Sequence, residues 1–219
     1  MLFESLKKTC LDEWNSYLTH PFVKTLGTGR LDRKCFEHYL KQDYLFLIQF
    51  SRAYGLAVFK SRTLEDIRQA AAGLRAMIDT EIGLHVSYCA EWGIPERTLS
   101  RTPEARATLA YTRYVLERGM AGDLLELHVA LAPCIVGYAE LAAWLVSEPE
   151  TVLDGNPYKS WIEMYAGDDY RNVATEEVAY INALGAGLPE RRVNELAATF
   201  RDATRLEIEF WEMGLNLDS

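Results

Sequence analysis

Residues 32–60 read DRKCFEHYLKQDYLFLIQFSRAYGLAVFK, and this stretch decides the fold class. Its apolar side chains recur at spacings of three and four residues, which is the period of one face of an α-helix. Asp32 has the short polar side chain that is typical of a helix N-cap, so the stretch predicts a long helix that runs to about Lys60. The same period continues through nearly the whole chain, and no alternating run of β-branched residues is long enough to demand a sheet. We therefore expect an all-α protein.

Proline and glycine residues divide the periodic sequence into about eight helical pieces. Thr63, followed three residues later by Asp66, has the spacing of a capping box, and Asp123 is placed to cap the segment that carries Cys134. The loops are short, and there is no break in composition, no linker and no internal repeat. Residues 1–219 are therefore expected to form a single helical bundle with a pocket between facing helices.

Charge and composition limit the partners that this chain is expected to have. The 219 residues include 23 Lys and Arg against 32 Asp and Glu, a net charge of -9 that repels polyanions, so no nucleic-acid partner is expected. The longest apolar run, around residues 129–136, is interrupted by Pro133 and is too short to predict a membrane span. The N-terminus lacks the basic-then-apolar order of a secretory signal, so a cytoplasmic location is expected.

Four cysteines, Cys10, Cys35, Cys89 and Cys134, are spread along the chain without a CxxC or any other metal-ligand spacing. This pattern favours free thiols over a disulfide framework or a structural zinc site. A single cysteine in such a chain is most often a small buried hydrophobic residue. Only its local context can indicate a chemical role.

Asp43 interrupts the apolar face of the predicted long helix. It shares that face with Phe46, Leu47 and Phe50, so its carboxylate belongs to a buried stripe. A buried carboxylate is costly unless it is paired or hydrogen-bonded, and such groups are over-represented at functional sites. Two interpretations stay open on this segment alone: a structural hydrogen bond to a neighbouring helix, or a functional carboxylate.

A second unusual segment contains Pro133 and Cys134 within an apolar helix. The proline removes one backbone hydrogen bond and is expected to bend the helix, which can open space beside it. Cys134 and Tyr138 lie one turn apart on the same face, and Gly137 permits the close approach of another backbone or a ligand. No histidine lies within four positions of Cys134, which argues against a protease-like Cys–His pair.

A third segment places a carboxylate among aromatic rings near the C-terminus. Glu207 shares a helix face with Phe210 and Trp211, whereas Glu209 and Glu212 fall on other faces and are expected to be solvated. Glu207 is therefore the better candidate for a carboxyl group tuned for acid–base chemistry. Further rings lie at Tyr111, at Tyr114 and in residues 161–165, and such aromatic stripes belong more often to a core than to a ligand site.

Taken together, these segments resemble the TenA family, the thiaminase II or aminopyrimidine aminohydrolase proteins. The likeness covers essentially the full chain and rests on the order of its motifs, which are Gln42-Asp43-Tyr44-Leu45-Phe46, Pro133-Cys134 with Gly137-Tyr138, Trp161 to Tyr165, and Glu207 before Phe210-Trp211. The resemblance implies a single-domain, haem-oxygenase-like helical bundle. It also implies a homotetramer that needs no cofactor.

The resemblance further implies roles for individual residues. Asp43 would bind the amino group and a ring nitrogen of a pyrimidine, Cys134 would be the nucleophile, and Glu207 would be the acid–base group. Tyr111, Tyr138 and Tyr165 would line the substrate pocket, and Phe46 stands where the family often carries Tyr, so that one hydroxyl is missing. The implied reaction belongs to thiamin salvage. It converts 4-amino-5-aminomethyl-2-methylpyrimidine to the hydroxymethylpyrimidine, with slower cleavage of thiamin.

Two other functions are weighed against this one. A haem-oxygenase-like di-metal oxidase needs several inward-facing carboxylates and histidines, but all four histidines lie in the first 128 residues. Only Glu81 and His85 have an i, i+4 metal spacing, and we expect them to form an intrahelical hydrogen bond or a surface pair. No residue is singled out as a haem ligand. The other alternative is a non-catalytic pyrimidine-binding or regulatory protein. The core of such a protein would tend to avoid carboxylates on apolar helix faces, and this chain has two of them.

Overall fold

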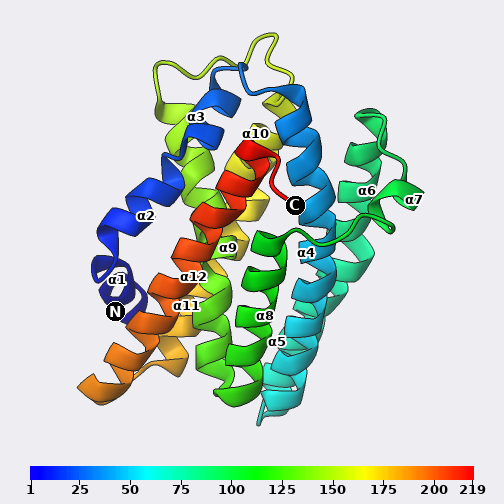
Figure 1. Cartoon of the computed structure of the whole chain (residues 1–219). Coiled ribbons are helices and arrows are strands. Elements are labelled where there is room, and N and C mark those ends of the chain that lie inside the picture. The colour runs from blue at the N-terminus through cyan, green and yellow to red at the C-terminus, as the bar shows by residue number, and fades with distance from the viewer.

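A computed structural model describes all 219 residues as a bundle of α-helices with no strand (Figure 1). The all-α prediction is therefore confirmed. The structure has more helices than the eight expected pieces, because short helices fill the N-terminal region and the connection after residue 91. The elements are α1 Leu2–Lys8, α2 Leu11–Leu18, α3 Pro21–Gly27, α4 Arg33–Lys60, α5 Leu64–Arg75, the π-helical segment η1 Ala76–Glu81, α6 Ile82–Glu91, α7 Glu96–Leu99, α8 Arg106–Ala121, α9 Leu124–Ser147, α10 Lys159–Ala166, α11 Asp168–Leu184 and α12 Glu190–Asn216.

The three predicted N-caps are confirmed. The Asp32 carboxylate accepts a hydrogen bond from the backbone N–H of Lys34 at 2.8 Å and begins α4. The Thr63 hydroxyl accepts from the N–H of Asp66 at 3.1 Å and begins α5. The Asp123 carboxylate accepts from the N–H at position 126 and begins α9. Each cap satisfies a backbone donor that the first turn of a helix would otherwise leave unpaired.

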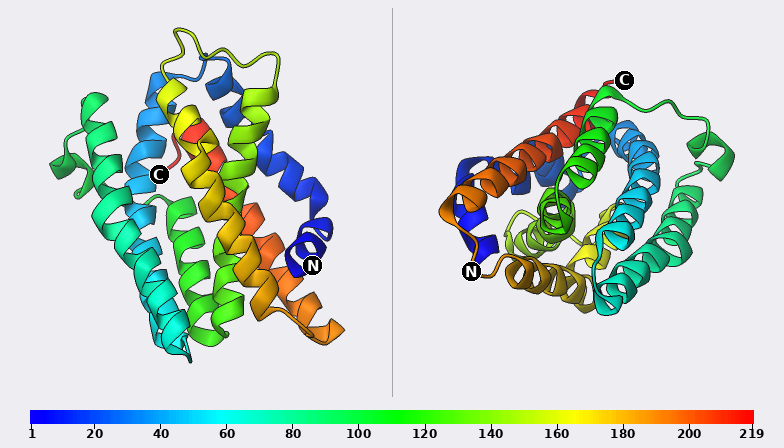
Figure 2. Two further views of the ribbon diagram at one scale, coloured as in Figure 1. Left: turned by 180° about the vertical axis from the view of Figure 1, so that it is seen from behind. Right: turned by 90° about the horizontal axis from the view of Figure 1, so that it is seen from below.

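Helix α9 runs through the middle of the bundle, with α4, α8, α11 and α12 around it (Figure 2). Nearly all of its side chains from 125 to 142 are buried. By length and composition alone, α9 could cross a membrane. We did not predict this from the sequence, because we considered only the shorter apolar run that Pro133 interrupts. However, 72% of its most apolar stretch is buried inside the protein, as is typical of a core helix. This test is weak support for a membrane segment.

Aromatic rings close the half of the bundle between α2, α3, α4 and α12. The Trp211 ring stacks on Phe22 at 5.0 Å between ring centroids and packs against Tyr39 at 5.3 Å. The Tyr17 ring also stacks on Trp211, at 6.2 Å between centroids, and Trp211 is fully buried. Such large rings exclude water from this half. Open space in the bundle is left on the opposite side of α9.

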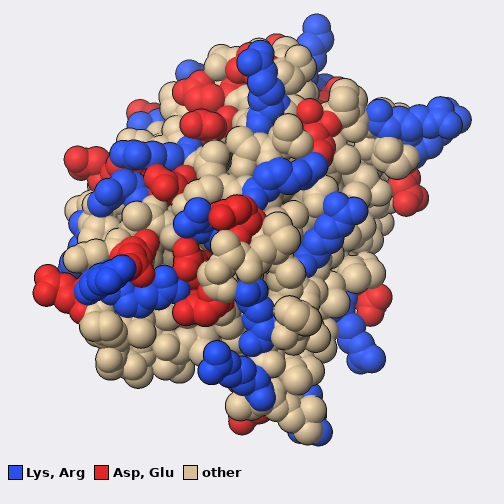
Figure 3. Space-filling view, turned by 60° about the horizontal axis from the view of Figure 1, so that its bottom comes forward, with Lys and Arg blue, Asp and Glu red and all other residues tan.

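That opposite side is covered by one continuous helical segment, α5, η1 and α6, and by α11. The π-helical turn η1 widens the helix locally and is the kind of irregularity that occurs often at functional sites. Gly73 on α5 has no Cβ, which leaves room for the Tyr54 ring of α4 directly beneath it. The surface outside is of mixed charge, and Figure 3 shows Lys and Arg side chains interspersed with Asp and Glu on one face.

Gly137 permits a close approach, as expected, but the group that approaches is a side chain. A Cβ at this position would overlap the ring of Tyr17, which is fully buried and whose hydroxyl donates to the Pro133 carbonyl at 3.3 Å. The ring cannot retreat, because Trp211 stacks on it. Gly137 therefore fixes how closely α2 packs on α9.

We predict that Gly137→Ala destabilises the protein by about 1–3 kcal/mol, because the added methyl group overpacks the core. Gly83→Ala is the matched control: this helical glycine of α6 has open space around its Cβ position, so alanine should stabilise by about 0.5–1 kcal/mol. Denaturant unfolding followed by circular dichroism measures both. Equal effects of the two variants would contradict the assigned contact with Tyr17.

Candidate active site

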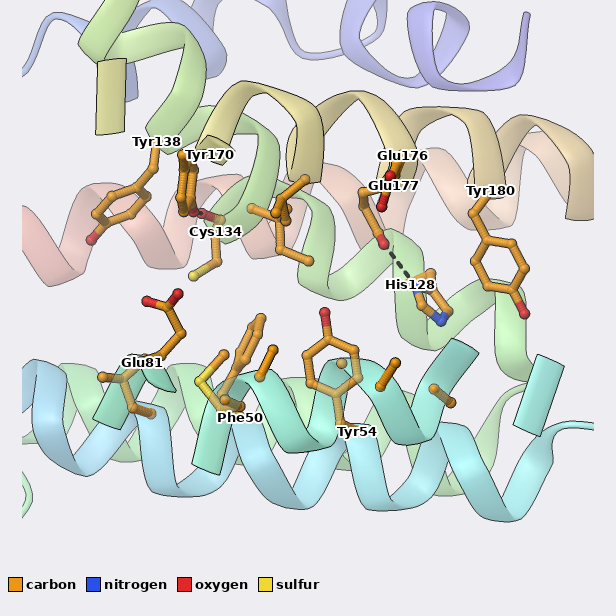
Figure 4. A pocket seen from close by; sticks show the side chains of 18 of the residues that line it. Phe50, Tyr54, Glu81, His128, Cys134, Tyr138, Tyr170, Glu176, Glu177 and Tyr180 are labelled. Carbon is orange, nitrogen blue, oxygen red and sulfur yellow. Dashed lines mark hydrogen bonds and ion pairs between the residues drawn. The ribbon is translucent and has the colours of Figure 1, made fainter. Parts of the chain in front are cut away.

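A cavity of about 370 Å³ lies between α4, α5 with η1, α9, α10 and α11 (Figure 4). Four of the predicted site residues line it, namely Asp43, Cys134, Tyr138 and Tyr165. Phe46, Tyr111 and Glu207 do not line it. The structure thus brings the candidate nucleophile and one of the two candidate carboxylates into the same enclosed space.

The Cys134 side chain points into this cavity (Figure 4). Burial raises the pKa of its thiol well above the usual value, and the nearby charges of Glu207 and Asp43 raise it further. The thiol is therefore protonated at neutral pH in the empty cavity. A reaction that uses this sulfur as a nucleophile must remove its proton as the new bond forms.

Asp43 is buried and faces His85, a partner that the sequence did not indicate. The imidazole Nε2 lies 2.8 Å from the backbone carbonyl oxygen of Leu40, which can only accept, so Nε2 carries a proton. The other ring nitrogen, Nδ1, lies 3.4 Å from Asp43 Oδ2. This second contact is attractive only when the pair holds a further proton. We expected an intrahelical hydrogen bond or a surface pair for His85, and this expectation is wrong. The His85 side chain of α6 instead contacts α4.

The pKa of Asp43 is raised to about 6 by burial, and the nearby Glu81 charge adds to the rise, whereas His85 opposes it. Glu81 lies on η1 and lines the cavity opposite Cys134 (Figure 4). Its own pKa is raised by burial. The described chain contains no group of three or more His, Cys, Asp or Glu side chains arranged to hold a metal ion. The Glu81 and His85 side chains both act on the Asp43 carboxyl group through their charges.

Glu207 is 1% exposed and lies in the packed layer between α12 and α8. The Tyr111 hydroxyl donates to its Oε1 at 2.8 Å. Burial raises the pKa of Glu207 to about 8, the Tyr111 hydrogen bond opposes this, and the Asp43 charge adds to it. Glu207 therefore carries a proton at neutral pH. It is close enough to Cys134 for its charge to shift the thiol pKa, although it has no surface on the cavity.

Phe46 belongs to the same packed layer. Its ring lies 5.0 Å from that of Tyr111 and 5.8 Å from that of Phe210, measured between centroids, and it is 5% exposed. A tyrosine at position 46 would place its hydroxyl in the layer beside Glu207 and Tyr111. The replacement of that tyrosine by phenylalanine therefore does not change the lining of the cavity.

Tyrosine rings form much of the cavity wall. Tyr138 and Tyr165 pack at 4.9 Å between centroids, and Tyr165 packs edge-on against Tyr170 at 4.8 Å. The Tyr170 hydroxyl donates to the Cys134 carbonyl at 3.4 Å. Flat faces of this kind suit a flat ligand.

Several cavity residues were missed by the sequence reasoning, although a signal for some of them was present. Asp43, Leu47, Phe50 and Tyr54 follow one another at spacings of four, three and four residues and all line the cavity. Tyr170, Val173, Glu177 and Tyr180 do the same on α11. His128, buried on α9, completes the wall through a 2.8 Å contact with Glu177. Extending the Asp43 face by one more turn beyond Phe50 would have found Tyr54.

Residues 8–217 match the sequence model of the TENA/THI-4/PQQC family. An aminopyrimidine aminohydrolase from Halalkalibacterium halodurans is 34% identical over 93% of this chain and 90% of its own length. A protein of Haemophilus influenzae described as uncharacterized is 41% identical over 99% of this chain and all of its own length.

Solved structures agree with this match. A crystal structure from Silicibacter sp. TM1040, described as a TenA family transcription regulator, superposes with a TM-score of 0.90 at 41% identity and covers 98% of this chain and 96% of its own. A domain from Shewanella denitrificans with a haem-oxygenase-like fold superposes with a TM-score of 0.75 at 14% identity, covering 98% and 92% of the two chains. The latter likeness concerns the fold alone, and it confirms the predicted haem-oxygenase-like architecture.

We predict that Glu207→Gln stabilises the protein in a pH-dependent way. Because the folded chain holds a proton on Glu207 where the unfolded chain has lost it, wild-type stability falls as pH rises from the ordinary pKa of glutamate to about 8. Glutamine is neutral throughout, so the advantage of the variant should grow by about 1 kcal/mol per pH unit between about pH 5 and pH 8 and then level off.

Urea unfolding at several pH values measures this advantage. Glu209→Gln, an exposed position on the same helix, is the matched control and should show no such trend. A pH-independent difference between wild type and Glu207→Gln would show that Glu207 ionises normally.

Proposed function

The chain belongs to the TENA/THI-4/PQQC family, and on that premise we propose that it is a hydrolase that replaces the group on the exocyclic methylene of an aminopyrimidine by hydroxyl. The single observation that carries the proposal is the convergence of Asp43 and Cys134 on one tyrosine-lined cavity, with Glu207 in the packed layer behind its wall. The name of the Halalkalibacterium halodurans relative supports the same substrate class.

Recognition of the ring uses Asp43 and the tyrosines. An aminopyrimidine presents an amino group next to a ring nitrogen. A carboxylate accepts a hydrogen bond from the amino group, and it accepts a second one from the ring nitrogen when that nitrogen carries a proton. His85, which does not line the cavity, contacts Asp43 at 3.4 Å, and it holds the carboxylate in place when the imidazole carries a proton on both nitrogens. Tyr138 and Tyr165 supply aromatic faces for the ring.

The first chemical step is addition of the Cys134 thiol to the ring. The sulfur forms a bond to a ring carbon, and the thiol proton ends on a ring nitrogen, so the adduct is neutral and electron-rich. The raised pKa of the thiol requires this coupling of proton transfer to bond formation. Asp43, bound at the nitrogen, stabilises the N–H that forms.

The second step expels the leaving group and adds water. The electron-rich ring breaks the bond between the methylene and its amine, and Glu207 gives its proton to the departing nitrogen. This transfer requires the Glu207 carboxyl group, which hydrogen-bonds to Tyr111 behind the cavity wall, to turn toward the cavity when substrate is bound. Water then adds to the methylene and returns a proton to Glu207, after which the sulfur leaves and takes back its own proton. The sum is an aminomethyl group and water converted to a hydroxymethyl group and ammonia.

We propose 4-amino-5-aminomethyl-2-methylpyrimidine as the substrate, with thiamin as a slower one, and therefore a role in thiamin salvage. The cytoplasmic location, which we expect from the N-terminal sequence, and the homotetramer, which the family resemblance implies, both stay predictions. The mixed surface charge and the net charge of -9 favour a small molecule over nucleic acid as the partner.

Replacing Cys134 by Ser should abolish turnover of the aminomethylpyrimidine, because a hydroxyl is a far weaker nucleophile than a thiol in this site. The measurement is ammonia release together with a helical circular-dichroism spectrum, which should not change. Cys35→Ser removes another buried thiol, outside the cavity, and should keep full activity. Undiminished hydrolysis by the Cys134 variant would remove the nucleophile assignment.

The pH dependence of kcat/KM should be bell-shaped. The active form needs Asp43 ionised and Glu207 protonated, so the rate should fall below about pH 6 and again above about pH 8. Glu207→Gln should lower kcat by a factor of about 100 or more at the optimum, since it removes the proton donor. A rate that rises steadily through pH 9 would contradict the role given to Glu207.

A further inference from the structure

The cavity is longer than an aminopyrimidine ring. Along α9, Cys134 and His128 are six residues apart, which is about 9 Å of helix, and Asp43 and Tyr54 are about 16 Å apart along α4. All four residues line the cavity, and Figure 4 shows Cys134 toward one end and Tyr54 with His128 toward the other. A ring held by Asp43 beside Cys134 therefore leaves the far end of the cavity open.

This distal end, formed by Tyr54, His128, Glu177 and Tyr180, has its own chemistry. Glu177 is buried and its Oε1 lies 2.8 Å from His128 Nδ1. A proton on His128 Nδ1 can be donated to this carboxyl group. No Lys or Arg lines any part of the cavity, and His128 is the only basic side chain on its wall.

Aromatic rings accompany the carboxylate. The Tyr180 ring packs edge-on against His128 at 4.8 Å, and the Tyr54 hydroxyl points into the cavity (Figure 4). Gly73 makes room for the Tyr54 ring in this position. A buried carboxyl group among aromatic rings is a combination that can bind flat organic cations.

The distal end also has an outlet. Exposed residues of α5 and α11, including Ala72, Val173 and Glu176, form the rim of the cavity. Next to the rim, the Tyr180 hydroxyl donates to Asp66 Oδ1 at 3.1 Å and ties α11 to α5. A substituent carried by the ring can therefore reach from the methylene past Glu177 to the rim, where Glu176 adds a second negative charge.

We propose that the distal end is a subsite for the leaving group and that it selects cationic, flat leaving groups against anionic ones. The proposal rests on the proposed function, because it takes the aminopyrimidine to be held by Asp43. A thiazolium ring joined to the methylene, as in thiamin, fits this chemistry, whereas a phosphate at the same place is repelled by Glu177 and Glu176.

The test measures binding in the Cys134→Ser background, in which no substrate is consumed. Calorimetry gives the Kd of three ligands that share the pyrimidine: thiamin, hydroxymethylpyrimidine, and the phosphate ester of hydroxymethylpyrimidine. Adding Glu177→Gln keeps an oxygen that accepts from His128 but removes the charge. The Kd of thiamin relative to that of hydroxymethylpyrimidine should rise about tenfold, and the relative Kd of the phosphate ester should fall.

Two further variants separate charge from damage to the fold. Glu176→Gln, at the exposed rim, should shift the thiamin ratio in the same direction by about two- to threefold. Glu163→Gln removes an exposed carboxylate of α10 outside the cavity and should shift neither ratio. Equal losses for all three ligands, or an unchanged thiamin ratio in Glu177→Gln with the fold intact, would overturn the subsite.

Failure of the subsite and failure of the proposed function give different results. The proposed function fails if the wild-type chain releases no ammonia from the aminomethylpyrimidine and no thiazole from thiamin. The subsite fails if the chain turns over these substrates but the Kd ratios do not respond to Glu177→Gln. If none of the three ligands binds, both proposals are overturned.

Discussion

Desolvation of ionisable side chains around α9 is the constraint on which the rest of the site depends. Asp43, Cys134 and Glu207 are all placed where a charge is costly, and burial is the largest cause of the shift in each of their pKa values. Each group responds by holding its proton to a higher pH. The protein thereby keeps a thiol and a carboxylic acid together near neutral pH, the two proton-bearing groups that addition and elimination at a ring require.

The packed half of the bundle makes this burial possible. Trp211, Phe22 and Tyr17 stack behind α9, and Gly137 lets Tyr17 lie against the same helix that carries Cys134. The carbonyls of residues 133 and 134 both accept from tyrosine hydroxyls, one on α2 and one on α11. The backbone that positions the sulfur is therefore held from both sides of α9. Movement of that backbone would cost packing on one side and cavity shape on the other.

The sequence could predict what depends on a single helix. The caps at Asp32, Thr63 and Asp123 follow from local chemistry, and the apolar face of α4 follows from its period. What depends on two helices could not be predicted in this way. The spacing of Glu81 and His85 indicated a contact along one helix, but His85 contacts Leu40 and Asp43 of another, because α6 packs against α4.

The same distinction explains the outcome for the residues taken from the family resemblance. Tyr138 and Tyr165 line the cavity, whereas Tyr111 and Phe46 lie in the layer around Glu207. The periodicity of a helix cannot distinguish a ring that faces a cavity from a ring that faces another ring.

The two ends of the cavity differ in how a histidine meets a carboxylate. At Asp43 the imidazole presents Nδ1 at 3.4 Å while Nε2 donates to the Leu40 carbonyl, so the contact with the carboxylate needs a second proton on the ring to be attractive. At Glu177 the imidazole presents Nδ1 at 2.8 Å, where a single proton on that nitrogen can be donated to the carboxyl group. Proton exchange with a ring nitrogen suits the first arrangement, and attraction of a fixed positive charge suits the second. The proposed substrate matches these two ends, with a weakly basic ring beside the sulfur and a cation at the distal end.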